Sequence, residues 1–228
     1  MRFIIDGHAV FGATGGRKHE ASRSLAVFAH GAGLDHTVWA LQSRWLAFHG
    51  WNVLALEAAA RFPERVQSIV LIGAAAAMPV HPDLLAASAA NEHAAIDMVN
   101  IWGHGHTAGL GGSCAPGVWM VGTAERILEK AAPGVLHIDL KACNAYRDGL
   151  AAAAQVAAPA LLICGERDQM TPLKGGRALA ASIPGATIVA LQGAGHMLLA
   201  ERPYEVQGAI AKHLAVNPTR VSPVAVKD

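Results

Sequence analysis

Charged and aromatic residues are both scarce in this chain of 228 residues. Asp, Glu, Lys and Arg make up 15% of it and Phe, Trp and Tyr only 5%, whereas 53% is hydrophobic. A composition this apolar excludes a disordered chain and predicts a large buried core. The formal net charge is +1, which gives no electrostatic reason to expect nucleic acid or an anionic membrane as a partner.

Cysteine is also scarce, and long hydrophobic runs are missing. The three cysteines, Cys114, Cys143 and Cys164, include no Cys-x-x-Cys pair and are odd in number, which argues against a disulfide framework. The amino-terminal segment reaches Asp6 too early for a signal-peptide core. We therefore expect reduced thiols and a cytoplasmic protein. The apolar runs are short or interrupted by Gly and Pro, so no membrane span is predicted.

Short, continuous apolar runs alternate along the chain with stretches of helical pattern. Such runs are typical of strands that are covered on both faces, as in a parallel sheet. The predicted strands are 25–29, 51–56, 68–73, 160–164 and 187–191, and the clearest predicted helices are 38–48, 176–182 and 203–214. This alternation predicts an α/β fold with a mostly parallel, doubly wound sheet.

The texture of the sequence changes between residues 74 and 149. There, Ala-rich helical stretches alternate with Gly-rich loops and with two polar and aromatic pieces, 102–106 and 116–120. We interpret 74–149 as a helical lid inserted into a core formed by 1–73 and 150–214. Residues 215–228 contain two prolines, and we expect them to form a flexible tail. The length suits one domain of this kind.

Two late segments carry an acid and a base after predicted strands. Asp168 ends the sequence Gly-Glu-Arg-Asp, four residues beyond the strand 160–164, and His196 ends Gly-Ala-Gly-His, five residues beyond the strand 187–191. In open α/β sheets, catalytic residues gather at the carboxyl ends of the strands. A carboxylate followed by a histidine favours a pair in which the acid fixes the imidazole tautomer and stabilises its protonated form. Alternatively, Asp168 caps a helix and His196 is an ordinary loop residue.

Together with an early turn, these segments resemble the α/β-hydrolase fold family, specifically its small lidded members. The resemblance rests on Val-Phe-Ala-His-Gly-Ala-Gly at 27–33, on 59–73, on Cys-Gly-Glu-Arg-Asp at 164–168 with Thr-Pro behind it, and on 193–203. It implies that Asp168 is the triad acid, that His196 is the base and that the Ala32 amide is one oxyanion donor. No cofactor or metal is expected.

The sequence departs from this family at Leu56-Glu57. Relatives place a Gly-rich loop, a helix, a strand and the nucleophile elbow there, on the order of 30 residues or more, but nothing intervenes in this chain. No Gly-x-Ser-x-Gly is present, so the nucleophile, the second oxyanion donor and the central elbow strand are all missing. We predict an internal deletion, in the gene or in its prediction. The strands 25–29 and 68–72 would then have to pair directly to satisfy their backbone groups.

No other residue replaces the nucleophile convincingly. Ser113 stands in Gly-Gly-Ser-Cys-Ala at 111–115, but an elbow requires a preceding strand, and this serine lies in the predicted lid. Cys114 and Cys143 have no activating base nearby in the sequence.

Two further patterns are weak. His104 and His106, with His81 and His93 elsewhere, suggest a metal site, but the first two lack helical i,i+4 spacing, and we found no carboxylate or cysteine that completes the set. The sequence Gly-Ala-Thr-Gly-Gly at 12–16 resembles a dinucleotide-binding turn, yet it is not followed by the clear helix that a pyrophosphate needs.

Two function classes therefore stand open. The first is a hydrolase of a small, partly apolar ester or related substrate, impaired because the nucleophile is missing. The second is a non-catalytic ligand-binding module or a truncated fragment. The expected partner is a small molecule, with no nucleic acid and no membrane, and no oligomeric state is predicted. The residues expected to line its pocket are Gly33, Trp102, Trp119 and Met120.

Overall fold

The computed structural model describes residues 2–5, 8–11, 25–29, 31–48, 52–54, 66–114 and 117–216. The junction Leu56-Glu57, the turn 12–16 and His30 lie outside the described residues. So does most of the predicted tail, of which α9 includes 215 and 216.

Three parallel strands form the centre of the described structure. They are β5 (Ile69–Ile72), β6 (Ala160–Gly165) and β7 (Thr187–Leu191), with β6 in the middle and parallel to both neighbours. Every residue of β6 is buried, because helices cover both faces of the sheet. The prediction of an α/β fold with a mostly parallel sheet is confirmed.

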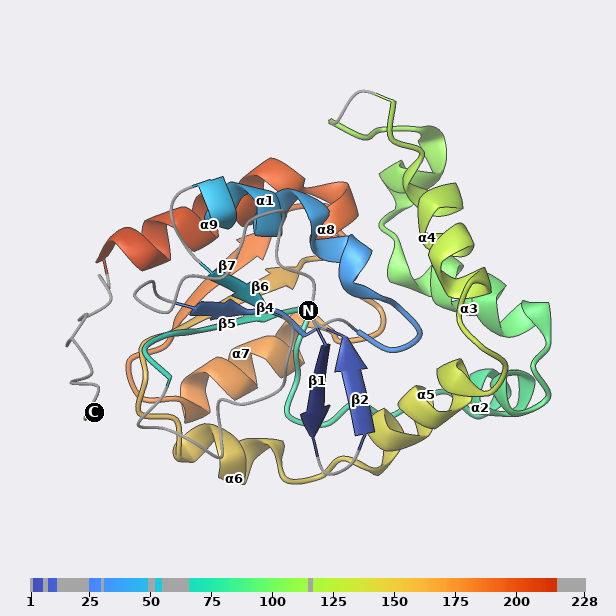
Figure 1. Ribbon diagram of the computed structural model, residues 1–228, viewed down its shortest axis with the longest axis horizontal. Coiled ribbons are helices and arrows are strands. Elements are labelled where there is room, and N and C mark those ends of the chain that lie inside the picture. Colours follow the sequence, from blue (N-terminus) through green and yellow to red (C-terminus); the bar gives the residue numbers. More distant parts are fainter. Residues whose placement is uncertain are drawn as a thin grey trace.

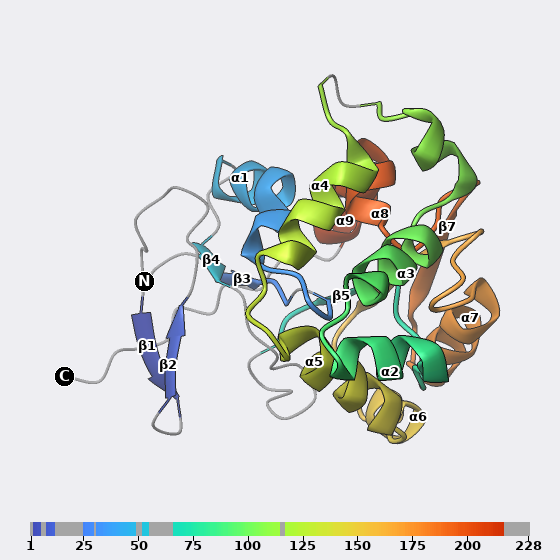
Figure 2. The same ribbon diagram turned by 90° about the vertical axis from the view of Figure 1, so that its right-hand side faces the viewer.

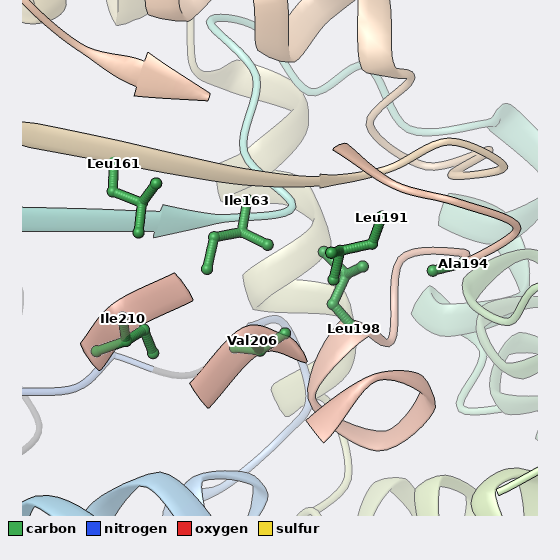
Figure 3. Close-up of a cluster of buried hydrophobic side chains, with 7 residues drawn as sticks. All are labelled: Leu161, Ile163, Leu191, Ala194, Leu198, Val206 and Ile210. Carbon is green, nitrogen blue, oxygen red and sulfur yellow. The ribbon is translucent and has the colours of Figure 1, made fainter. Parts of the chain in front are cut away.

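The two faces of β6 follow its period of two. Leu161 and Ile163 point toward Val206 and Ile210 in a cluster below the sheet in Figure 3. Leu162 and Cys164 belong to the opposite cluster, which includes Leu179. Fully burying a leucine or isoleucine contributes about 1.5 to 3 kcal/mol relative to leaving it exposed, so both faces anchor the strand.

The helices around this sheet form two layers (Figure 1). On one side lie α1 (Ala40–Phe48), α8 (Leu198–Glu201) and α9 (Pro203–Val216). On the other side lie α6 (Gly149–Ala154) and α7 (Leu173–Ser182). A 3₁₀ helix, η1 (His36–Trp39), leads into α1, and the Asp35 side chain accepts a hydrogen bond from the Thr37 amide at its start.

Two smaller pairs of strands accompany the central sheet. The strands β3 (Leu25–Val27) and β4 (Asn52–Leu54) are parallel partners, and β1 (Arg2–Ile5) and β2 (His8–Phe11) form an antiparallel pair. Within the described residues, β3 pairs with β4 and β5 pairs with β6, in separate sheets. The prediction that 25–29 and 68–72 pair directly is therefore wrong for this part of the chain, because no hydrogen-bonded ladder joins β3 to β5 among the described residues.

Between β5 and β6 the chain forms a helical insertion, defined as α2 to α5 and gathered at one end of the sheet (Figures 1 and 2). Its elements are α2 (Pro82–Ala89), α3 (His93–Gly103), the 3₁₀ helix η2 (His106–Leu110), α4 (Met120–Glu129) and α5 (Val135–Ala145). A cluster that includes Leu84, Val99, Leu128 and Leu140 holds them together. Among the described helices, none has the length and apolar character needed to cross a membrane.

Candidate active site

Asp168 lies in the turn that follows β6, at the carboxyl end of the central strand. Its side chain is fully buried. Oδ1 accepts hydrogen bonds from the Met170 amide at 2.8 Å and from the Thr171 amide at 2.7 Å. An Asp side chain that accepts bonds from amides two and three residues ahead stabilises such a turn. The local sequence thus fixes where the carboxylate points.

His196 lies in the loop after β7, and its ring meets this carboxylate. The distance from His196 Nδ1 to Asp168 Oδ2 is 2.8 Å, and the histidine side chain is 25% exposed. With Asp168 ionised, Nδ1 carries the ring proton and donates a hydrogen bond to Oδ2. Nε2 is then the nitrogen with a free lone pair. The structure therefore brings together the two late residues that the sequence singled out.

Thr171 completes the surroundings of the pair, although no role for it was predicted. Its Oγ1 lies 2.7 Å from Asp168 Oδ2, 3.1 Å from His196 Nδ1 and 3.0 Å from the carbonyl oxygen of Gly73. The hydroxyl links the acid, the base and the end of β5. The available signal was its place three residues behind the acid.

The electrostatics of the site keep Asp168 ionised. Burial is the largest influence and by itself raises its pKa, but the hydrogen bond and charge of His196 and the hydrogen bonds from Thr171 outweigh burial. The pKa of Asp168 is therefore lower than the ordinary value of an aspartate. An ionised carboxylate in contact with Nδ1 is the arrangement that makes the imidazole an effective base.

Backbone contacts with the helical insertion hold the His196 loop in place. The amides of His196 and Met197 both donate to the carbonyl oxygen of Gly103, each at 2.8 Å. Glu201, only 1% exposed, accepts from the amide of Gly105 at 3.0 Å and from that of Gly195 at 3.0 and 3.1 Å. The His196 loop is therefore attached to the end of α3. Glu201 stands in the 193–203 stretch of the sequence, where no role is predicted for it.

Gly73 leaves just enough space for the His196 ring. Its φ is +57°, and a Cβ at this position would lie 3.0 Å from His196 Cε1 and 3.1 Å from Nδ1. A side chain here would strain the backbone and crowd the imidazole ring. A glycine directly after β5 therefore leaves room for the His196 ring.

The early turn, of which residues 31–34 are described, contacts the insertion directly. The Gly33 amide donates to Asp139 Oδ2 on α5 at 2.9 Å. The φ of Gly33 is +68°, and a Cβ there would meet Leu136 and Leu128 at 2.8 and 2.9 Å. Ala32 contacts the same apolar cluster as Trp102 and Met197. The predicted oxyanion residue, two predicted pocket residues (Gly33 and Trp102) and the His196 loop therefore share one neighbourhood.

The other predicted pocket residues lie at the start of α4. Met120 is buried, whereas Trp119 is 65% exposed and its ring covers Gly122. Neither is among the described members of the cluster around Ala32.

Two of the candidate replacements for a nucleophile, Ser113 and Cys143, do not lie in the setting that such a residue needs. Ser113 lies in the irregular segment between η2 and α4, without the strand that an elbow needs. Burial and the charge of Asp139 raise the pKa of the Cys143 thiol, and burial is also the main cause of the raised pKa of Cys164. A raised pKa keeps a thiol protonated and weakly nucleophilic.

The histidines considered as metal ligands are dispersed. His104 is buried and its Nδ1 contacts the Asn100 carbonyl oxygen at 2.9 Å, whereas His106 is exposed. In the part of the chain that the structure describes, one group of side chains has the spacing to hold a metal ion, namely His93 with Glu125 and Glu129.

Comparisons with known proteins agree with this fold. A search of curated proteins found no match. The chain is similar to the solved structure of a thermophilic esterase (TM-score 0.74, 22% identity, 96% of this chain and 98% of the other covered). It is also similar to the enol-lactonase from Burkholderia xenovorans LB400 (TM-score 0.80, 17% identity, 94% of this chain and 100% of the other covered). A third similar structure is that of an enzyme that degrades N-acyl homoserine lactones (TM-score 0.73, 14% identity, 93% of this chain and 99% of the other covered).

At these identities the likeness concerns the fold. The model of the alpha/beta hydrolase fold family, however, matches residues 53–203, which include both Asp168 and His196. The chain therefore belongs to the α/β-hydrolase fold family.

Proposed function

We propose that this protein is a hydrolase by descent, with a small, partly apolar ester or lactone as substrate, and that this form is catalytically impaired. The observation that carries the proposal is the 2.8 Å contact between Asp168 and His196 at the carboxyl ends of β6 and β7. The impairment follows from the sequence, which contains no Gly-x-Ser-x-Gly.

The remaining residues support direct attack by water. In this scheme His196 Nε2 takes a proton from a water molecule, whose oxygen forms a bond to the ester carbonyl carbon. The carbon–oxygen bond to the leaving group then breaks, and His196 returns the proton to the leaving alkoxide, giving an acid and an alcohol. Asp168 stabilises the protonated imidazole, and the Ala32 amide is the remaining oxyanion donor. Without the covalent step and the second donor, turnover is slow.

The substrate class is supported by the surroundings of the pair and by the neighbours of the fold. Ala32, Trp102 and Met197 give the site an apolar side next to the helical insertion, which we propose to be the lid. The similar structures named above include an esterase, an enol-lactonase and a lactone-degrading enzyme. The three free cysteines fit a reducing compartment, and we propose the cytoplasm as the location.

The proposal is tested by the hydrolysis of p-nitrophenyl acetate and γ-butyrolactone. We expect slow hydrolysis by the full chain and a loss of about 100-fold or more in His196→Ala, the usual scale for removing a general base. His106→Ala, which removes an exposed histidine of the insertion, is the matched control and should retain the rate. Equal rates in the full chain and in His196→Ala would contradict the proposal.

The second candidate is a ligand-binding module without catalysis. It is favoured by the tight attachment of the lid to the His196 loop through Gly103 and Glu201, which preserves the site without the elbow. No hydrolysis together with a cooperative thermal transition would support this alternative, whereas a non-cooperative transition would indicate a truncated fragment.

A further inference from the structure

On the outside of the insertion, four polar side chains of α3 and α4 face one another. The two helices lie side by side (Figures 1 and 2). His93 begins α3, and Asp97 follows one turn later. Glu125 and Glu129 stand one turn apart on α4. Residues four apart lie on the same side of a helix, so each helix directs a pair of potential ligands toward the other.

The distances place one nitrogen and two carboxylates around a common point. His93 Nε2 lies 3.2 Å from Glu129 Oε1. One ligand atom each from His93, Glu125 and Glu129 lies within 4.8 Å of the others. Ligands of a tetrahedral Zn²⁺, bound at about 2.1 Å, are separated by about 3.4 Å. The His93–Glu129 pair already has that spacing, and small rotations of the partly exposed Glu125 side chain bring its carboxylate to the same distance.

Asp97 supplies the second, independent feature of a metal centre. Its Oδ1 lies 3.2 Å from His93 Nδ1, on the opposite side of the ring from Glu129. A carboxylate that accepts the proton of one ring nitrogen fixes the tautomer and directs the other nitrogen to the metal, as in many zinc sites. Nε2 lies within hydrogen-bond distance of Glu129 Oε1, so a proton joins these two atoms when no metal is bound, and a cation that replaces this proton can bind both.

We infer that His93, Glu125 and Glu129 form a site for a divalent transition-metal ion such as Zn²⁺, oriented by Asp97. One imidazole nitrogen and two carboxylate oxygens are ligands that zinc accepts, with water at the fourth position. The bound ion tethers α3 to α4 on the outer side of the insertion. This inference is independent of the proposed hydrolase function, because none of the four residues contacts Asp168 or His196 among the interactions of the described residues.

Arg126 is the group that competes with the ion. Its guanidinium pairs with Glu129 Oε2, and Nη2 lies 3.9 Å from Glu125 Oε1. Both carboxylates are therefore partly neutralised in the absence of metal. Removing this cation strengthens metal binding, whereas an ordinary surface ion pair predicts only a weaker contact between the helices.

The inference is tested by isothermal titration of the full chain with Zn²⁺ alone, near neutral pH and in a buffer that does not chelate metal. We expect one equivalent to bind. Binding should be lost in His93→Ala and in Glu125→Gln, be weakened about 10-fold or more in Asp97→Asn, and be strengthened in Arg126→Gln. The melting temperature should rise with Zn²⁺ in the same variants that bind it.

The matched control is His106→Ala, which removes another exposed histidine of the insertion and should bind Zn²⁺ like the parent. Mg²⁺, which prefers all-oxygen octahedral sites, should bind far more weakly. Absence of Zn²⁺ binding, or equal binding by the parent and His93→Ala, would overturn the inference. Weaker binding in Arg126→Gln would overturn the role of Arg126 as competitor.

Discussion

At the scale of single residues, Asp168 is held by hydrogen bonds on both carboxylate oxygens. It accepts from the amides of Met170 and Thr171, and its other oxygen contacts His196 Nδ1 and the Thr171 hydroxyl. Its position in the sequence, shortly after a buried strand, was enough to predict its place at the site. The partner Thr171 was not assigned, because a threonine behind an aspartate is common and only the folded chain brings it to Gly73.

The lowered pKa of Asp168 makes stability depend on pH in a defined direction. The unfolded chain binds a proton at a higher pH than the folded chain, so the stabilisation is complete above the ordinary carboxyl pKa and is lost as pH falls through the folded-state value. Asp168→Asn should remove this dependence and, by weakening buried hydrogen bonds, destabilise the protein by about 1 to 3 kcal/mol at neutral pH.

Urea unfolding from about pH 3 to about pH 7 measures both effects. The control is Asp83→Asn, whose parent side chain is 77% exposed and should change stability little. An acid dependence that is the same in Asp168→Asn and the parent would show that other carboxylates determine it.

At the scale of elements, the short helix α8 connects the His196 loop to the insertion. Glu201, its last residue, is buried and accepts hydrogen bonds from the amides of Gly105 and Gly195. The sequence predicts the strands and helices of the core from their periodicity. It does not predict this contact, because residue 201 meets residue 105 only when the insertion folds back over the end of the sheet.

Glu201→Ala should therefore loosen the insertion and the His196 loop together. It leaves two buried N–H groups without an acceptor, each costing about 1 to 3 kcal/mol. Glu201→Gln keeps one acceptor oxygen and should cost less. Chemical denaturation measures the loss, with Glu205→Ala as the control because Glu205 is 57% exposed on α9. If Glu201→Ala and Glu205→Ala had equal free energies of unfolding, the buried Glu201 carboxylate would have no structural role.

At the scale of the whole molecule, the described strands form separate sheets that differ in strand length and in the number of paired neighbours. The strand β6 is buried throughout and pairs on both sides, whereas β3 and β4 have three residues each and pair with one another. Direct pairing of β3 with β5 was predicted from the backbone groups that a lost central strand would expose. The hydrophobic pattern predicts that each segment is a strand, but it does not specify which strand becomes its neighbour, and the described β3 and β5 lie in separate sheets.

Hydrogen exchange should reveal this difference. Amides of β6 should exchange only by global unfolding, whereas those of β3 and β4 should exchange through smaller local openings. Mass spectrometry of peptides that cover 25–27, 52–54 and 160–165 measures the protection. Equal protection of the three peptides would indicate that the strands unfold as one cooperative unit.

The sequence by itself determined the fold class, the family, the region of helices between β5 and β6, and the pair Asp168 and His196. These depend on local patterns: apolar runs, glycine turns and short motifs after strands. Only the tertiary structure decided that Thr171 and Glu201 support the pair, that Asp139 accepts from the Gly33 amide, and that His93 meets Glu125 and Glu129. These contacts join residues from different helices, strands or loops, and only the packing of those segments in the folded chain brings them together.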